Sequence, residues 1–468
     1  MSFQFRACTL DQPLLLAPSL QQWLPEEHLA RFIADVTEQL DLSAIYSAYD
    51  RRDGRGQEGY HPLLMTRLLL YGYCVGVASS RALERKSYED VAFRYLAADQ
   101  HPDHDTIANF RKQHLATLGG LFMQALQLCQ KAGLVKLGHV AIDGTKMQAN
   151  ASKHKAMSYG RMGEAEQKLQ AEVEALLRHA EEVDEAEDRQ YGKGQRGDEL
   201  PPELARRESR LKKIREAKEA LEAEAQQKAQ EQKAEAEAKI AARQEQEKQT
   251  GRKPRGRAPQ VHNPEQAKPE SSAQRNFTDP ESRIMPDGVH KGSFLQAYNA
   301  QAAVDSGAQI IVAAEITQQS NDKQQLVPML QQVIENVNGK PKVASADTGY
   351  WSAANATAEN LQGIDLYVAT ERQQHGESKN APEHGLPEGN SVLQQMRDKL
   401  KTEAGKAVYK MRKQIVEPVF GYIKEGRGFR RFTFRGLGNV RSEWRLICAT
   451  HNLLKLFRSG WKMQPLSS

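Results

Sequence analysis

Residues 164 to 249 constrain the fold of this chain more than any other segment. Their composition changes abruptly to Glu, Lys, Ala and Gln. Apolar residues recur there in alternating steps of four and three: Leu169, Val173, Leu176, Ala180 and Val183. Such a repeat lays an apolar stripe along a helix, as in a coiled coil. The glycines and prolines of "YGKGQRGDELPPE" break this helix, and the stripe resumes at Leu204, Leu211, Ile214 and Leu221. We therefore predict a helical hairpin over residues 164–250, inserted into a fold of another kind.

Short apolar and β-branched runs lie on both sides of this insertion. An apolar strand ends in Asp143 before the hairpin. After it, the runs 296–305 and 308–317 are joined by Asp-Ser-Gly, a hairpin turn signal. "KVASADTGY" and "GIDLYVAT" read as short strands, and helical patterns cover residues 321–337, the surroundings of Glu417, and 442–457. These alternating elements predict an α/β fold.

Residues 1–135, in contrast, read as helical. Apolar residues recur there at helical spacing, for example over 63–71 and 118–128. Between these runs, "SYEDVAFRYLAADQHPDHDTIANFRKQH" predicts two short helices joined by a turn, with Asp105 as N-cap of the second. Two interpretations stay open: a helix-turn-helix that presents Arg111, Lys112 and His114 to DNA, or a bundle corner with a solvated basic face.

The charge is unevenly distributed along the chain. Lys and Arg number 65 against 60 Asp and Glu, but residues 405–468 contain 14 basic and three acidic residues. Such clustering is typical of a polyanion-binding surface, although basic faces are often only solvated. The four cysteines show no paired spacing, which argues against a zinc site or disulfide framework and favours a reducing compartment. No apolar run approaches the roughly 18 residues of a membrane span, so we expect a cytoplasmic protein.

Two of the predicted strands end in an aspartate that is followed by a turn-forming glycine. These residues are Asp143 and Asp347. If both strands are parallel and adjacent, the two carboxylates emerge side by side. Two like charges at that distance require protons or cations, and Mg²⁺ is the natural cation because it prefers oxygen ligands and leaves positions open for phosphate oxygens.

The basic C-terminal segment offers a third acid. Glu417 stands on a predicted helix between Lys413, one turn before it, and Lys424, about two turns after it. In an arbitrary helix this pattern indicates a surface ion pair. The two strand-end aspartates favour the catalytic interpretation here.

Three of these segments together resemble a known family. They are "AIDGTKMQANASKHKAMSY", "ADTGYW" and "YKMRKQIVEPVFGYIKEGRGFRRFTFRG". They are similar to the motif regions of bacterial insertion-sequence transposases of the DDE type, most of all the group written IS-eleven-eighty-two. The resemblance implies an RNase H-like mixed sheet flanked by helices, in which Asp143, Asp347 and Glu417 are the catalytic, metal-binding triad. It also implies two Mg²⁺ ions, for which Mn²⁺ can substitute, and strand cleavage and strand transfer by two-metal phosphoryl transfer.

The third motif departs from the family signature in one respect. In the family, Tyr is followed by Arg three residues later, by Glu four residues after that, and by Lys a further seven residues on. Glu417 and Lys424 keep their spacing, but Tyr409 and Arg412 stand one residue too far upstream. Either Arg412 or Lys413 therefore fills the arginine position.

Several residues are expected to contact double-stranded DNA. Near the first aspartate, Lys146, Lys153, His154 and Lys155 either hold the DNA backbone or form a solvated loop. Trp351 either stacks on an unpaired base or packs in the core. In "GRGFRRFTFRG", phenylalanines alternate with Arg427, Arg430, Arg431 and Arg435, which is typical of an extended segment with an apolar and a cationic face. Phosphate contacts are also expected from the third-motif residues Tyr409, Arg412, Lys413 and Lys424.

A Pro-rich basic segment, residues 251–290, follows the hairpin. Its Arg255 and Arg257 flank a glycine as in an AT-hook, which enters the minor groove, but Ala258 stands where that motif has proline. The alternative is a flexible linker.

The predicted organisation has five parts. Residues 1–135 form a helical DNA-binding domain, 136–163 the first part of the catalytic domain, 164–250 the inserted hairpin, 251–290 the linker, and 291–460 the remainder of the catalytic domain. Because both transposon ends must be held together, the resemblance implies a homodimer or a larger assembly. Two other functions stay open: an RNase H-like nuclease without a role in transposition, and a non-enzymatic DNA-binding coiled-coil protein.

Overall fold

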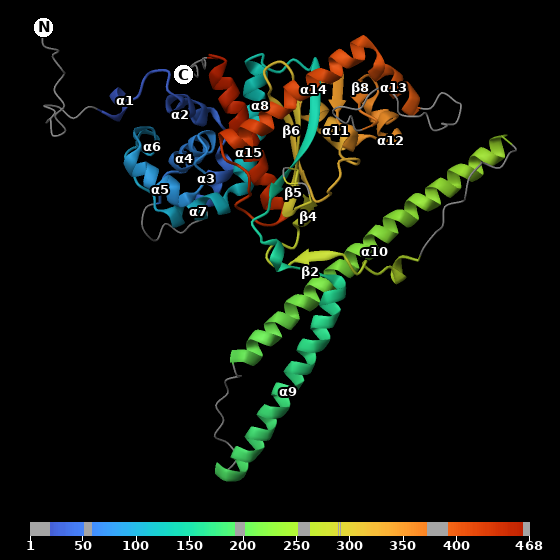
Figure 1. The fold of residues 1–468 in the computed structure, drawn as a ribbon. Coiled ribbons are helices and arrows are strands. Elements are labelled where there is room, and N and C mark those ends of the chain that lie inside the picture. The colour runs from blue at the N-terminus through green and yellow to red at the C-terminus, as the bar shows by residue number, and fades with distance from the viewer. Residues whose placement is uncertain are drawn as a thin grey trace, which may run out of the picture.

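The computed structural model describes residues 19–50, 59–191, 202–250, 263–288, 290, 292–371 and 392–461. Figure 1 shows a body in which a group of N-terminal helices lies beside a sheet covered by helices, and a pair of long helices that projects from this body. No helix in these ranges is long and apolar enough to cross a membrane.

The N-terminal segment is helical, as predicted. Its helices are α1 (Leu20–Trp23), α2 (Leu29–Gln39), α3 (Ser43–Asp50), α4 (Pro62–Cys74), α5 (Ser80–Glu89), α6 (Val91–Leu96), α7 (His104–Gln113) and α8 (Leu115–Lys131). The N-cap of α7 is Asp103, whose carboxylate accepts a hydrogen bond from the Thr106 amide, and not Asp105, which lies in the first turn. The predicted helices on both sides of the His-Pro-Asp turn are therefore correct, and the cap is displaced by two residues.

A mixed sheet forms the centre of the body. Within the described residues it has six strands in the order β4-β5-β1-β7-β8, and β6 also pairs with β5. The strands are β1 (His139–Gln148), β4 (Arg283–Pro286), β5 (Phe294–Asp305), β6 (Ile311–Thr317), β7 (Val343–Ala346) and β8 (Asp365–Val368). The predicted hairpin is the antiparallel pair β5 and β6. The α/β class is thus confirmed.

Strands β1 and β7 are parallel neighbours, and their register positions the two aspartates. The last paired residues are Ile142 and Ala346. In each case the following residue is one of the predicted acids: Asp143 follows Ile142, and Asp347 follows Ala346. One expectation was wrong: Asp143 does not end its strand, because β1 continues to Gln148 through antiparallel pairing with β5.

Helices cover the sheet and connect it with the N-terminal helices. The later helices are α11 (Leu326–Val337), α12 (Ala353–Ala356), α13 (Val392–Lys401), α14 (Glu403–Gly421), which continues into the π-helical turn η5 (Tyr422–Gly426), and α15 (Leu437–Arg458). α14 packs on β1, β5, β7 and β8, whereas α15 packs on β6 and also on α8 and α4. A single hydrophobic cluster therefore runs from the N-terminal helices into the sheet.

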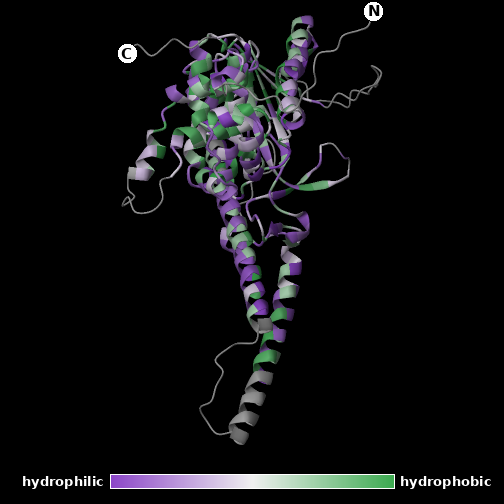
Figure 2. Ribbon diagram, turned by 90° about the vertical axis from the view of Figure 1, so that its left-hand side faces the viewer, coloured by the Kyte–Doolittle hydropathy of each residue, from purple (hydrophilic) through white to green (hydrophobic). Residues whose placement is uncertain are grey.

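The inserted segment contains two long helices. They are α9 (Tyr159–Tyr191) and α10 (Pro202–Thr250), which pack against each other. Leu169 of the predicted stripe is buried against Leu211, Ile214 and Leu221. Figure 2 shows that the projecting helices are mostly hydrophilic, with isolated hydrophobic positions. The apolar stripe thus determines which residues the two helices bury against each other.

Part of the expected linker has regular structure. β3 (Gln274–Asn276) pairs with β2 (Ala156–Ser158) at the base of the two long helices, and β4 pairs with β5. These short strands lack an alternating pattern of their own, so the sequence did not predict them. Pairing with the partner strand decides their conformation. Arg255 and Arg257 lie outside the described residues.

Candidate active site

Two carboxylates form the centre of the site. Asp143 accepts hydrogen bonds from the Gly144 amide, at 2.8 Å, and from Arg412 Nη1, at 3.3 Å. Asp347 accepts one from the Gly349 amide at 2.8 Å and caps the short helix η3 (Thr348–Tyr350). The predicted adjacency of the two acids therefore follows from the parallel pairing of β1 and β7.

Both carboxylates lie where negative charge is unfavourable. Burial raises the pKa of Asp143 to about 6, an effect that Arg412 opposes and the charge of Asp347 increases. Burial also raises the pKa of Asp347, while the Gly349 amide and Arg412 lower it. A cation or a proton is therefore required before both groups are stable together.

Helix α14 contributes the third-motif residues. Arg412 is buried and faces Asp143, and it lies over the Tyr409 ring at 5.8 Å from the ring centroid. Burial lowers the pKa of Arg412, but Asp143, Tyr409, Asp347 and Glu417 raise it, and the result is a net increase. Lys413 and Glu417 are exposed. Of the two alternatives for the arginine position, the structure places Arg412 beside the aspartates.

Sequence reasoning missed a third carboxylate, that of Asp322. It precedes α11, and its Oδ1 atom lies 4.0 Å from Lys146 Nζ and accepts hydrogen bonds from the side-chain amides of Asn299 and Gln301. Its negative charge raises the pKa of Asp143 and of Asp347. An isolated acid before a helix reads as a capping residue, so no pattern in the sequence distinguished it.

Two lysines lie near these carboxylates, Lys146 on β1 and Lys424 on η5. Lys146 is half-buried on β1, and burial lowers its pKa against the opposing influence of Asp322, Asp347 and Asp143. Lys424 Nζ donates a hydrogen bond to the backbone carbonyl of Lys146 at 3.0 Å. Lys153, His154 and Lys155, in contrast, are exposed on the short helix η1 that precedes β2. The predicted basic group therefore divides into a buried part and an exposed part.

Two predicted DNA contacts were wrong. Arg111 is only 7% exposed and donates hydrogen bonds to the Ala78 carbonyl and to Ser80, and its neighbour in the prediction, His114, is also buried. Arg427 is 4% exposed and donates to Thr450 Oγ1 at 2.9 Å and to the Ile447 carbonyl at 3.1 Å. Both guanidinium groups connect helices within the protein, so they are not available to phosphates. Lys112 of the same predicted group is exposed.

The C-terminal alternation of Phe and Arg is an extended segment, as predicted. Phe429 and Phe432 are buried, whereas Arg430, Arg431 and Arg435 are exposed. The segment is attached to the end of β1, because Arg431 forms an isolated bridge with Gln148. Trp351 is half-buried and packs against the core, as in the second of the two interpretations given for it.

Two segments of the chain match known protein families. Residues 18–113 match the family described as Transposase domain (DUF772), and residues 373–457 match the Transposase DDE domain. The two matches together support a DDE-type insertion-sequence transposase. No curated protein and no solved structure matches the chain. The resemblance in the sequence is thereby confirmed for the DDE type, and the matches do not distinguish its groups.

The two family matches lie at opposite ends of this transposase. The first covers α1 to α7, and the second covers α13 to α15, including Glu417. Asp143 and Asp347 lie outside both. Their assignment depends on the strand register and on the charges around them.

The carboxylates of Asp143 and Asp347 are oxygen donors of the kind that divalent cations prefer. DDE domains generally use divalent metal ions. Within the described ranges, no group of three or more His, Cys, Asp or Glu side chains is arranged to hold an ion. Mg²⁺ does not require such a group, because it is usually bound by one or two carboxylates, several waters and substrate phosphates. The paired oxygens of Asp143 and Asp347 provide that donor set.

The affinity of the transposase for Mn²⁺ should depend on pH through Asp143. A metal ion binds the ionised carboxylate, and burial raises the pKa of this group to about 6. Above this pKa the affinity should be constant. Below it, a proton competes with the ion, and the affinity should fall about tenfold for each pH unit. Titrations followed by the electron paramagnetic resonance (EPR) of free Mn²⁺ between pH 5 and 8 would measure this, and a flat profile would contradict it.

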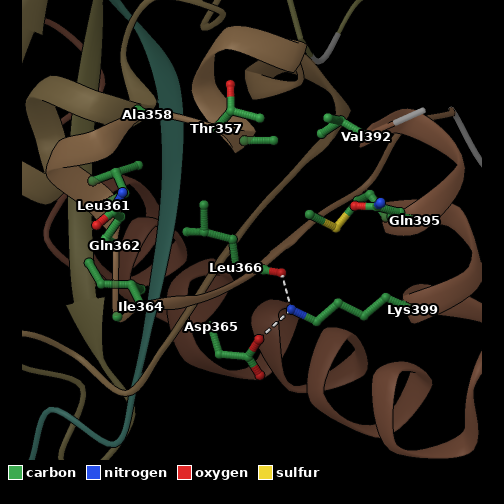
Figure 3. A pocket seen from close by; sticks show the side chains of 13 residues that line it. Thr357, Ala358, Leu361, Gln362, Ile364, Asp365, Leu366, Val392, Gln395 and Lys399 are labelled. Carbon is green, nitrogen blue, oxygen red and sulfur yellow. Dashed lines mark hydrogen bonds and ion pairs between the residues drawn. The ribbon is translucent and has the colours of Figure 1, made fainter. Parts of the chain in front are cut away.

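One pocket lies apart from the carboxylates. It has a volume of 330 Å³ and is lined by β8, α13 and the segment 356–364 (Figure 3). Lys399 forms an ion pair with Asp365 at its edge and donates to the Leu366 carbonyl at 2.7 Å. None of the predicted catalytic residues lines this pocket.

Proposed function

We propose that this transposase binds the terminal inverted repeats of an insertion sequence, cuts the DNA strands there and joins them to target DNA. The observation that carries the proposal is the pairing of β1 with β7, which brings Asp143 and Asp347 together beside Arg412. The mixed sheet, with its late acidic helix α14, supports an RNase H-like catalytic domain.

In this proposal Asp143, Asp347 and Glu417 hold two Mg²⁺ ions, or Mn²⁺ in their place. When bound, the ions would activate the attacking oxygen and stabilise the leaving oxygen of an in-line displacement. Arg412 orients the Asp143 carboxylate through its hydrogen bond at 3.3 Å. It also supplies positive charge next to the reacting phosphate. Lys424 fixes the part of β1 beyond Asp143 through the Lys146 carbonyl.

The DNA-binding surface consists of the basic residues that the structure leaves accessible. They are Lys112, Lys153, His154, Lys155, Arg430, Arg431 and Arg435. Contacts of exposed Lys and Arg with phosphates position a protein on duplex DNA without reading its sequence. Contact of Arg255 and Arg257 with the minor groove is also part of the proposal. The projecting helices α9 and α10 form a coiled-coil hairpin that joins two copies of the chain into a homodimer or a larger assembly on DNA.

The function is tested with the genomic DNA that flanks the coding region. Purified full-length protein is incubated with Mg²⁺ and plasmids that carry either these flanks or shuffled flanks. Cleavage confined to the native flanks, and abolished by a chelator, is expected. Equal cleavage of both plasmids would contradict the proposal and indicate a nuclease without a role in transposition.

A further inference from the structure

Asp322 lies between the part of β1 that follows Asp143 and the turn that follows Asp347. A Cβ atom added to Gly144, next to Asp143, would lie 2.9 Å from Asp322 Oδ1. A Cβ atom added to Gly349, two residues after Asp347, would lie 3.3 Å from Asp322 Oδ2 and 3.0 Å from Asp347 Oδ1. The two glycines therefore leave the space in which this third carboxylate approaches the backbone next to Asp143 and Asp347.

Neutral amides hold the Asp322 carboxylate in one orientation. Its Oδ1 atom accepts hydrogen bonds from Asn299 Nδ2 at 2.6 Å and from Gln301 Nε2 at 2.7 Å. Gln301 in turn accepts a hydrogen bond from the buried hydroxyl of Tyr350. The hydrogen bonds thus engage one carboxylate oxygen, and the other faces the Asp347 turn.

A buried amide oxygen next to the Asp322 carboxylate has no hydrogen-bond partner within the described residues. Asn299 is fully buried, and its Oδ1 atom accepts no hydrogen bond within the described residues. This oxygen lies 2.9 Å from the position of an added Gly144 Cβ, the same position that Asp322 Oδ1 approaches. A buried oxygen without a donor is unfavourable, and a cation with its waters would satisfy it.

We propose that Asp322 is a further cation-binding carboxylate of this transposase, which together with Asp347 holds one of the divalent ions. The proposal depends on the metal-dependent function proposed above and adds a residue outside the three predicted acids. Asp322 binds the ion directly or through one of its waters, since Mg²⁺ keeps several waters in protein sites.

The competing role for Asp322 is that of an ion-pair partner of Lys146. The two charged groups are 4.0 Å apart and both are largely shielded from solvent. An ion-pair role predicts a smaller effect of Asp322 on metal affinity, through its charge alone, than the loss of a ligand does. The size of the loss in affinity, together with the position of a bound ion, therefore separates the two roles without reference to strand cleavage.

The test compares Mn²⁺ binding by full-length variants, with free Mn²⁺ counted by EPR. Asp322→Asn keeps an oxygen that accepts the hydrogen bonds of Asn299 and Gln301 but removes the charge. We expect its Mn²⁺ affinity to fall at least about tenfold. Glu315→Gln is the matched control, because Glu315 is also a shielded acid next to β5 but pairs with Arg441 and Arg445. Its affinity should equal that of the wild type.

The possible outcomes separate the role of Asp322 from the metal-dependent function of the site. If Asp322→Asn binds Mn²⁺ as the wild type does while Asp347→Asn does not, Asp322 is not a ligand and the proposed function stands. If all the variants equal the wild type, both proposals fail. If Asp322→Asn does not fold, crystals of the wild type with Mn²⁺ decide the matter. An ion about 2.1 Å from an Asp322 oxygen, or joined to it by one water, supports the proposal, and a more distant ion overturns it.

Discussion

Replacing Asp347 with asparagine should lower the rate of strand cleavage at least about 10³-fold. A bound metal ion supplies several kcal/mol of transition-state stabilisation, and about 4 kcal/mol corresponds to that factor. The side-chain oxygen of the introduced asparagine can still accept the hydrogen bond of the Gly349 amide, so the turn should persist. Single-turnover cleavage of DNA that carries the native flanks, at saturating protein, would measure the change.

DNA binding provides the necessary comparison for this variant. Affinity for duplex DNA depends mainly on Lys and Arg contacts with phosphates. Asp347→Asn should therefore bind the flanks at least as well as the wild type in a gel-shift assay. Asp365→Asn, which removes an acid from the neighbouring strand β8, should keep normal cleavage. Cleavage by Asp347→Asn at the wild-type rate would refute the catalytic assignment.

Replacing Glu443 with alanine should destabilise the protein by about 3 to 5 kcal/mol. Glu443 is only 1% exposed, and it accepts hydrogen bonds from the backbone amides of Thr433 and Phe434 at 3.0 and 3.1 Å. Burial raises the pKa of Glu443, and the positive charge of Arg111 lowers it. The two buried charges therefore compensate each other. The alanine variant would leave these amides without their acceptor and would remove the negative charge that compensates Arg111.

The thermal midpoint would measure this loss. For a domain of the size of the catalytic region, the expected decrease is about 10 °C. Glu425→Ala is the control in the same segment, since Glu425 is exposed and pairs with the exposed Arg430. Its midpoint should change little, because surface ion pairs contribute between about 0 and 1 kcal/mol. Equal midpoints for the two variants would show that the buried network does not stabilise the segment.

Local patterns in the sequence predicted most elements of the fold. The turn between β5 and β6, the strand that leads to Asp347 and the helix that carries Glu417 follow from turn residues and from hydrophobic periodicity. These signals are local, because each depends on residues a few positions apart. The adjacency of Asp143 and Asp347 was predicted on the condition that their strands are parallel neighbours, and the register of β1 and β7 meets this condition.

The exposure of charged side chains was predicted less well than the elements that carry them, because residue type alone does not reveal the surroundings of a side chain. Arg111 and Arg427 were expected on a DNA-binding face, and the fold buries both. Each guanidinium group finds its acceptors on elements far away in the sequence, such as the carbonyls of Ala78 and Ile447. A basic side chain in an amphipathic pattern gives the same signal whether its partner is a phosphate or a distant carbonyl.

The sequence by itself determined most of the helices and strands, the inserted pair of long helices and the two candidate acids Asp143 and Asp347. Only the tertiary structure decided that Arg412 faces Asp143 and that Asp322 joins the same cluster. The physical reason is that hydrophobic periodicity acts within a segment. Burial, hydrogen-bond partners and pKa shifts depend on residues that the chain brings together from hundreds of positions apart.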